Sequence, residues 1–184
     1  EGDLLCSWLV PVNDAGILQL SAGIALMQSL DSIEIHQDEK INHWMKWPND
    51  VWIGERKFAG CLAEGKSKGQ ENRFVIGIGA NFMEKDEGFP IATIKHQNKD
   101  FQKRLDAALS GLIESKQGVP NMRNEEIINL AWGMMSAGLH NGQELQLSKQ
   151  TGSVVGLTNE GHLLVEFEDG VKEISATDGI QFLI

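Results

Sequence analysis

The chain has 184 residues, of which 41% are hydrophobic and 23% charged, with a formal net charge of −10. This composition is typical of one globular domain with a sizeable core, alone or with a small appendage. The excess of acid argues against binding of nucleic acid, which needs clustered Lys and Arg, and no apolar run approaches the roughly 18 residues of a membrane span.

The first half of the chain contains one helix signal among several strand signals. Residues 4–12 are apolar nearly throughout, as in a buried strand, and residues 17–30 show helical spacing of apolar side chains. Short strands are then expected at 44–46, 51–53, 57–64 and 73–78, with turn residues between them. These signals predict a mixed β-sheet with helices packed on one side.

Two helices and a group of short strands are expected in the second half. Apolar residues recur at helical intervals from Phe101, and Asn124-Glu125-Glu126 provides a capping side chain followed by acids, as at a helix start. From Gln143 the pattern changes to strands and tight turns over about 45 residues, enough for a small β-barrel. We therefore predict an α+β protein with a first domain over residues 1–139 and a barrel over residues 140–184.

The segment from Gly60 to Ser67 matches the phosphate-loop pattern G-x-x-x-x-G-K-S letter for letter. A phosphate loop must open a helix at its lysine, so that backbone amides and the helix dipole face the phosphates. Here Cys61-Leu62-Ala63 has the pattern of a strand interior, and a polar stretch from Lys68 leads into another strand. We favour a hairpin tip at Gly65-Lys66-Ser67 and keep a P-loop nucleotide hydrolase as an alternative.

Residue patterns for covalent or metal chemistry are missing from the sequence. The five histidines show no metal-ligand spacing, and neither a nucleophile elbow nor a catalytic carboxylate pair is present. The two cysteines, Cys6 and Cys61, are far apart, so we expect both to be buried, no metal site, and a reducing, cytoplasmic setting. Any chemistry must therefore depend on positioning and electrostatics.

The most specific signal is the segment Lys46-Trp47-Pro48-Asn49-Asp50, which places a lysine at the end of an extended stretch stiffened by proline. A hairpin up to Gly60 follows, and then two glycines at alternate positions, Gly77 and Gly79, just before Asn81. Such glycines let a flat ligand or a second backbone approach a sheet closely, or they reflect close strand packing alone. No helix opens after them, which excludes a dinucleotide-binding fingerprint.

In their order and spacing, these segments resemble the biotin protein ligases over nearly the whole chain. The resemblance implies the class II synthetase-like fold of biotin and lipoate ligases, followed by an SH3-like barrel. It implies that ATP and Mg²⁺ activate biotin to biotinyl-adenylate, and that biotin then passes to a lysine of a biotin carboxyl carrier protein or domain. No acyl-enzyme forms in such ligases, in agreement with the lack of a nucleophile here.

The resemblance also assigns roles to individual residues. Lys46 matches the motif lysine and would be the catalytic cation, in contact with both the biotin carboxylate and the phosphate. Asn81 matches the asparagine that would bind the adenylate near its adenine. The three glycines Gly60, Gly77 and Gly79 would leave room for the ligand against the sheet.

The other residues of the motif receive supporting roles. Asn49 and Asp50 are expected to shape the turn beside the site, with an Mg²⁺ contact of Asp50 as an alternative, and Trp47 to pack beneath it. For Arg56 and Lys57 a solvated hairpin is expected, with contact to pyrophosphate as the alternative.

The chain departs from the family at its start. It opens at Glu1 and lacks the Ser/Thr-rich turn and the Gly/Arg-rich loop that family members carry upstream of the first strand. We expect an upstream part of the catalytic domain to be absent from this chain, which alone would hold part of the adenylation site. The alternative is a non-catalytic ligand-binding or interaction module on the same fold. A homodimer joined through sheet edges would fit the family.

Overall fold

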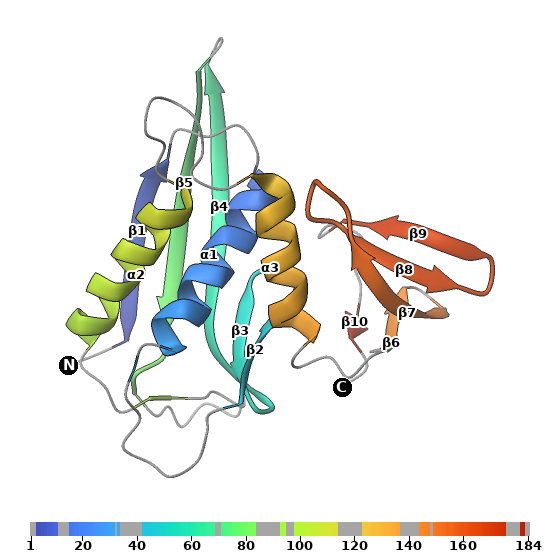
Figure 1. The fold of residues 1–184 in the computed structure, drawn as a ribbon, viewed down its shortest axis with the longest axis horizontal. Coiled ribbons are helices and arrows are strands. Elements are labelled where there is room, and N and C mark those ends of the chain that lie inside the picture. Colours follow the sequence, from blue (N-terminus) through green and yellow to red (C-terminus); the bar gives the residue numbers. More distant parts are fainter. Residues whose placement is uncertain are drawn as a thin grey trace.

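The computed structural model describes residues 3–10, 15–31, 33, 42–68, 71–83, 93–94, 98–113, 123–136, 144–147, 149–175 and 181–182. Within them, three helices lie on one face of a first β-sheet, and a second, smaller sheet follows (Figure 1). In chain order the elements are β1 (Leu4–Val10), α1 (Ala15–Asp31), β2 (His43–Lys46), β3 (Asp50–Ile53), β4 (Arg56–Lys68), β5 (Glu71–Ala80), α2 (Asn98–Ile113), α3 (Asn124–Ser136), β6 (Glu144–Leu147), β7 (Gln150–Leu157), β8 (Leu163–Phe167), β9 (Gly170–Ile174) and β10 (Gln181–Phe182).

The first sheet has the strand order β1-β5-β4-β3-β2, and every pair of neighbours is antiparallel. The prediction of a mixed sheet is therefore wrong for the described strands. The reason is that β2 to β5 follow one another through short turns, which permit only antiparallel pairing. Leu4 and Ile78 are buried beneath the helices, whereas Leu5 is 83% exposed, so the opposite face of this sheet is open.

The core lies between this sheet and the helices. α1 contacts both α2 and α3 as well as β4, and it carries apolar residues on most of its circumference because most of its side chains are buried. Phe58, Phe82 and Phe101 pack edge to face with ring centroids 5.3 to 5.9 Å apart, which fastens α2 to the sheet. No helix in the described part of the chain is long and apolar enough to cross a membrane.

The predicted helices and strands are present, but the central hairpin is longer than expected. β4 and β5 pair as far as Lys66 with Arg73 and Lys68 with Glu71, so the predicted hairpin tip at residues 65–67 is wrong. Because a hairpin needs only about two connecting residues, the polar residues interpreted as a turn extend the ladder instead. A continuous strand over residues 60–67 offers no helix N-terminus for phosphates, which excludes the P-loop alternative.

The second sheet has the order β10-β6-β7-β8-β9 and is also antiparallel. Leu145, Leu163 and Val165 are buried in it. Among the described strands, β9 and β10 are its two edges, so its closure into a barrel stays a prediction. The predicted domain boundary between residues 139 and 140 falls outside the described residues and stays a prediction as well.

Candidate functional site

One row of residues crosses the open face of the first sheet. Residues directly opposite each other on paired strands point to the same face. The register therefore aligns five residues from five strands, in the order Leu5, Gly79, Gly60, Asp50 and Lys46. Three of the predicted site residues and the turn residue Asp50 thus share one line across the sheet, although they lie far apart in the sequence.

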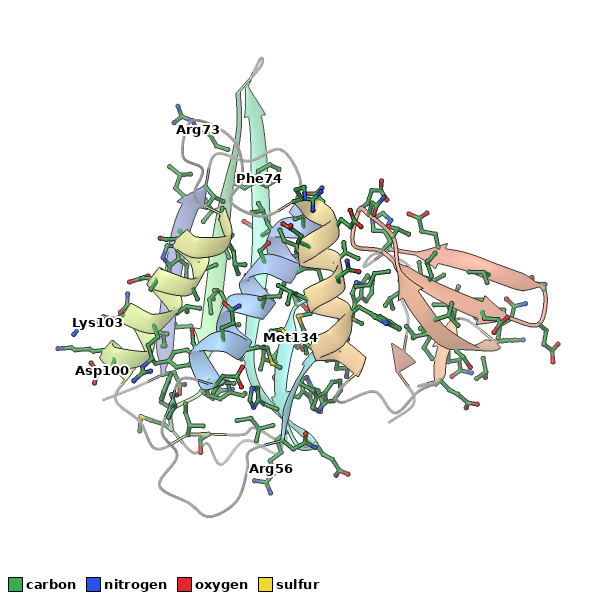
Figure 2. The ribbon with its side chains drawn as sticks, viewed as in Figure 1. Arg56, Arg73, Phe74, Asp100, Lys103 and Met134 are labelled. Atoms are coloured by element: carbon green, nitrogen blue, oxygen red, sulfur yellow. The ribbon has the colours of Figure 1, made fainter. Side chains whose placement is uncertain are left out.

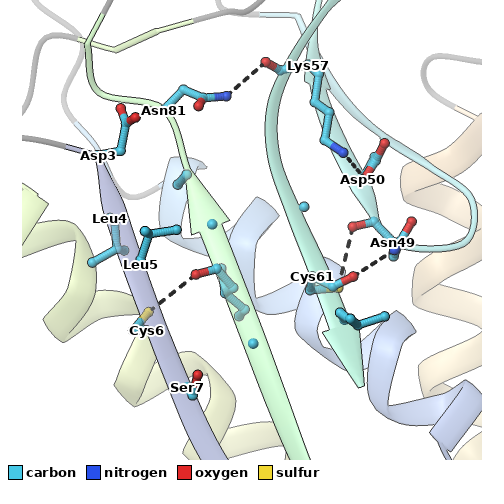
Figure 3. A pocket seen from close by; sticks show the side chains of 16 residues that line it. Asp3, Leu4, Leu5, Cys6, Ser7, Asn49, Asp50, Lys57, Cys61 and Asn81 are labelled. Atoms are coloured by element: carbon cyan, nitrogen blue, oxygen red, sulfur yellow. Dashed lines mark hydrogen bonds and ion pairs between the residues drawn. The ribbon is translucent and has the colours of Figure 1, made fainter. Parts of the chain in front are cut away.

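A cavity of about 740 Å³ lies along this face, between the first residues of β1 and the turn before β3 (Figure 3). Its volume is within the range of small-molecule sites, about 300 to 1,000 Å³. The lining includes six residues predicted for the site or its turn, namely Asn49, Asp50, Gly60, Gly77, Gly79 and Asn81. It also includes Leu5 and Leu62, which are exposed and make part of the wall apolar.

The glycines act in two different ways. A Cβ atom at Gly79 would lie 3.4 Å from the Leu5 side chain, and one at Gly77 would lie 3.9 Å from the Leu62 carbonyl oxygen. Neither would clash, but each would occupy part of the cavity floor. At Gly60, by contrast, a Cβ atom would lie only 2.9 Å from Asp50 Oδ1. Gly60 therefore makes room for a side chain that passes over it.

That side chain belongs to an ion pair. Lys57 Nζ lies 2.6 Å from Asp50 Oδ1 at the cavity wall (Figure 3). Lys57 is exposed, but its ammonium group is also paired at the cavity wall, so the expectation of a solvated hairpin holds only in part for this residue. For Arg56 it is confirmed, since its side chain is exposed and points away from the sheet (Figure 2).

A β-bulge places Lys57 on the same face of the sheet as Gly60. Strict alternation along β4 would put Lys57 and Gly60 on opposite faces. The pairing of β3 with β4 instead shifts between Val51 and Trp52, so that Trp52 is opposite Lys57 and Phe58 is the extra residue. The extra residue brings Lys57 back to the face of Gly60.

Lys46 lies at the end of the row and not among the residues that line the cavity. Its Nζ is 4.3 Å from the ring centroid of Trp52. Burial lowers the pKa of Lys46 most, the negative charge of Asp50 opposes this shift, and the positive charge of Lys57 adds to it. The structure therefore brings together two lysines and one carboxylate where a single cation was predicted.

The signature turn is held from two directions. Asn49 Nδ2 donates to the Cys61 carbonyl oxygen at 2.7 Å, and Cys61 N donates to the Asn49 carbonyl oxygen at 2.9 Å. Asn49 thus shapes the turn, as expected. The neighbouring Trp47 is 4% exposed, and its Nε1 donates to the Gly161 carbonyl oxygen of the second sheet at 2.8 Å.

Asn81 lies at the far end of the cavity, where β5 ends. Its backbone N and its side-chain Nδ2 both donate to the Phe58 carbonyl oxygen, at 3.0 and 2.9 Å. The next two residues, Phe82 and Met83, donate their backbone N–H groups to Asp3 Oδ1 at 3.0 and 3.2 Å. The side chain of Asn81 is therefore fixed beside the cavity by β4, and the backbone that follows it is held by Asp3.

The two cysteines line the cavity without offering a nucleophile. Burial is the main cause that raises the pKa of both thiols, Cys6 and Cys61, to about 12, so both are neutral near pH 7. Cys61 is buried as expected, but Cys6 is only half-buried, because β1 is an edge strand. The described residues contain no group of three or more His, Cys, Asp and Glu side chains that could hold a metal ion.

Known proteins share both the sequence pattern and the fold. Residues 3–81, which include Lys46 and all three site glycines, match the biotin/lipoate A/B protein ligase family. The bifunctional ligase/repressor BirA of Bacillus spizizenii is 28% identical over 184 residues, covering 92% of this chain. The crystal structure of the biotin protein ligase from Aquifex aeolicus matches with a TM-score of 0.74 at 25% identity, covering 100% of this chain and 84% of that one. Residues 3–81 of the chain thus match this ligase family, and the likeness to BirA extends over 92% of the chain.

Other matches mark how far the likeness to the ligase family extends. The chain spans about half the length of the curated relatives it matches, 54% in the case of the Bacillus BirA. The Aquifex ligase in complex with biotin and ATP matches with a TM-score of 0.70 at 27% identity, covering 100% of this chain and 80% of that one. A ligase-like protein of unknown function from Silicibacter matches with a TM-score of 0.73 at 14% identity, covering 94% and 78%, which shows a common fold alone.

Proposed function

We propose that this chain carries the adenylate-forming site of a biotin protein ligase. The protein would join biotin to AMP from ATP and then pass biotin to a lysine of a biotin carboxyl carrier domain. The observation that carries the proposal is the cavity on the open sheet face, with glycines as its floor, Lys57 in its wall and Lys46 beyond it at the end of the row. The Aquifex ligase structure with biotin and ATP, which shares this fold, supports the choice of ligands.

The proposed reaction needs positive charge where two anions meet. In the first step a carboxylate oxygen of biotin attacks the α-phosphorus of ATP, and the bond to pyrophosphate breaks. In the second, the carrier lysine amine attacks the acyl carbon, AMP leaves, and the amine loses a proton. Lys46 would reduce the repulsion between carboxylate and phosphate in the first step. Lys57, which is paired with Asp50, would add positive charge beside it.

The other ligand contacts follow from the shape of the cavity. Gly77 and Gly79 would let the flat rings of the ligand lie against the sheet. Asn81, fixed beside β4, would contact the adenine of the adenylate. Because the Asp50 carboxylate is already paired with Lys57, phosphate oxygens and water would supply most of the ligands of Mg²⁺, as is usual for this ion.

The parts of the molecule outside the cavity would serve the same reaction. We propose residues 1–139 as the catalytic domain and residues 140–184 as an SH3-like barrel that supports the signature turn through Trp47. The carrier domain would approach from the open face of the first sheet, the side on which Leu5 is exposed. A homodimer through a sheet edge is also proposed.

A second candidate is a non-catalytic ligand-binding module on the same fold. The observation in its favour is the close match in fold to the Silicibacter ligase-like protein of unknown function. Such a module would bind biotin or its adenylate at the same cavity without turning them over. Formation of biotinyl-adenylate from biotin and ATP, measured as release of pyrophosphate, separates the two candidates.

The proposal predicts that a hydrolysis-resistant biotinyl-adenylate analogue stabilises the protein through Lys46. At a hundredfold excess over Kd, a ligand of the folded state adds about 2.7 kcal/mol to the free energy of unfolding, which raises Tm by about 5 to 10 °C for a chain of this size. Lys46→Ala is expected to weaken binding and so to remove most of the rise. The measurement is a thermal-shift titration of both proteins.

Lys103 offers a matched control for this titration. It lies on α2, is 79% exposed and contacts only the neighbouring Asp100 among the ion pairs described (Figure 2). Lys103→Ala removes the same charge at a distance from the cavity and is expected to keep the full rise in Tm. An equal loss in both variants, or no rise in the unmodified protein, contradicts the proposed site.

A further inference from the structure

Trp52 lies beside the signature lysine although it is not part of the signature motif. It is two residues from Asp50 on β3 and therefore on the same face of the sheet as Asp50 and Lys46. Its ring packs against the Trp44 ring with centroids 5.8 Å apart and planes tilted by 40°. Trp44 is itself fixed, because its Nε1 donates to the Gly54 carbonyl oxygen at 2.9 Å. Trp52 therefore presents a supported aromatic face at the end of the row.

The hydrogen-bonding group of Trp52 does not explain this position. Its Nε1 is buried, and within the part of the chain that the structure describes it has no hydrogen-bond partner. A buried polar group without a partner is unfavourable, so it needs a compensating role for the side chain. The ring of Trp52 does make a contact, since its centroid lies 4.3 Å from Lys46 Nζ.

A ring and a carboxylate hold a lysine in different ways. Lys57 is held by Asp50, whose negative charge compensates that of the ammonium group. The face of an indole attracts an ammonium group through its quadrupole but carries no net charge. The contact with Trp52 therefore orients the Lys46 ammonium group without compensating its charge, unlike the contact between Lys57 and Asp50.

We propose that Trp52 is a positioning residue, which holds the Lys46 ammonium group over the sheet for an anionic ligand. The identity of that anion, the carboxylate and phosphate of biotin and ATP, rests on the proposed function. The contact itself does not. A lysine side chain has four rotatable bonds and loses considerable rotamer freedom when it is fixed. Because the ring already restricts the ammonium group in the free protein, Lys46 loses less rotamer freedom when a ligand binds.

The first test needs no ligand. Protons above an aromatic ring resonate upfield, so the ε-methylene protons of Lys46 should be shifted upfield in the NMR spectrum of the free protein. Trp52→Leu removes the ring and is expected to abolish the shift, whereas Trp52→Phe keeps a smaller ring and is expected to retain part of it. Trp8→Phe is the matched control, because Trp8 lies on the helix-facing side of β1 and bonds to Asp106 on α2. An unchanged Lys46 resonance in Trp52→Leu overturns the proposal.

The second test is a double-mutant cycle on the binding of the biotinyl-adenylate analogue. Trp52→Leu is expected to weaken binding by roughly 3- to 30-fold, the range of a cation–π contact, and Trp52→Phe by less. In a Lys46→Ala background, Trp52→Leu should cause no further loss. An equal loss in both backgrounds would show that Trp52 does not act through Lys46, and overturns the proposal. A protein that does not bind the analogue at all, but shows the ring-current shift, contradicts the proposed ligand and supports the positioning role.

Discussion

At the scale of single residues, the site depends on where side chains are absent. Gly60 allows the ion pair of Lys57 and Asp50 to cross the strand, because a Cβ atom there would lie 2.9 Å from Asp50 Oδ1 and 3.0 Å from Lys57 Nζ. Gly77 and Gly79 leave the floor of the cavity open, and a Cβ atom at either position would come no closer than 3.4 Å to its neighbours. Substitution of Gly60 should therefore disturb the ion pair, whereas substitution of Gly77 or Gly79 should fill part of the cavity.

Gly79→Ala should separate ligand binding from stability. The new Cβ atom would lie 3.4 Å from the end of the flexible Leu5 side chain, which can adjust. Glycine is also unfavourable in a strand interior, so Tm should stay equal or rise slightly. The added methyl group fills part of the cavity floor, and the affinity for the biotinyl-adenylate analogue should fall about tenfold, a cost of about 1.4 kcal/mol. Calorimetric titration and thermal unfolding measure the two effects.

Gly133→Ala is the control for that variant. Gly133 lies in the middle of α3, and a Cβ atom there would meet nothing within 4 Å. Alanine should add up to about 1 kcal/mol to the free energy of unfolding and leave affinity unchanged. A loss of stability in Gly79→Ala with unchanged affinity would contradict the proposed floor.

The charge of Lys46 predicts opposite effects of pH on stability and on binding. Burial lowers the pKa of Lys46 below its ordinary value of 10.5. The folded protein then binds fewer protons than the unfolded one between the lowered pKa and 10.5, so this residue makes the free energy of unfolding rise with pH in that window. Affinity for an anionic ligand falls in the same window, as Lys46 loses its charge.

The two effects can be isolated with Lys46→Gln. Relative to this variant, the natural protein should gain stability as the pH approaches 10.5 from below, and should lose its advantage in affinity over the same range. Unfolding in urea and titration with the analogue, at matched pH values, measure both. A stability difference that falls with rising pH would show that the pKa of Lys46 is raised instead.

At the scale of elements, periodicity in the sequence predicts the helices and strands of the first sheet but not how they pair in detail. Strict alternation of side chains places the row of Gly60 and Gly79 correctly, because β4 and β5 pair regularly there. The bulge at Phe58 has no such signal: the residue is apolar and buried like a regular strand residue, and only the pairing with β3 shows that it is extra. The ion pair of Lys57 with Asp50 was therefore not predicted.

Other parts of the site depend on contacts between residues far apart in sequence, which periodicity does not report. The position of Trp52 beside Lys46 could have been predicted. Lys46 and Asp50 face each other across a short turn, and Trp52 follows Asp50 by two residues, so all three point to the same face of the sheet. Its role as the support of the ammonium group depends on side-chain packing. The bond from Trp47 to Gly161 could not have been found, because no local pattern relates the two residues.

At the scale of the whole molecule, the two sheets meet at the signature turn. Trp47 lies between Lys46 and the turn, and its indole N–H donates to a carbonyl oxygen of the β7–β8 connection. That connection is organised by Thr158, whose Oγ1 accepts the backbone N–H groups of Glu160 and His162 at 3.2 and 3.3 Å. The second sheet can thus influence the position of Lys46 without lining the cavity.

Trp47→Phe should weaken both folding and binding. The variant leaves the buried Gly161 carbonyl oxygen without its donor, which should lower the free energy of unfolding by about 1 to 3 kcal/mol. The turn that carries Lys46 loses its support, so affinity for the analogue should also fall. Denaturant unfolding and calorimetric titration measure the two.

Thr158→Ala tests the same link from the other side. It removes the hydroxyl group that organises the connection in the second sheet and leaves the first sheet unchanged. Affinity should fall in the same direction and by less. If both variants lose stability while affinity stays the same, the second sheet does not position the lysine.

The bond between Trp47 and Gly161 also has a consequence for the order in which the protein is made. Its two partners are 114 residues apart, and ribosomes add roughly 5 to 20 residues per second. The turn with Lys46 therefore exists for several seconds before its partner carbonyl has been synthesised. A nascent chain that stops before Gly161 contains every residue of the cavity but lacks this support, so the turn gains it only after a further 114 residues have been translated.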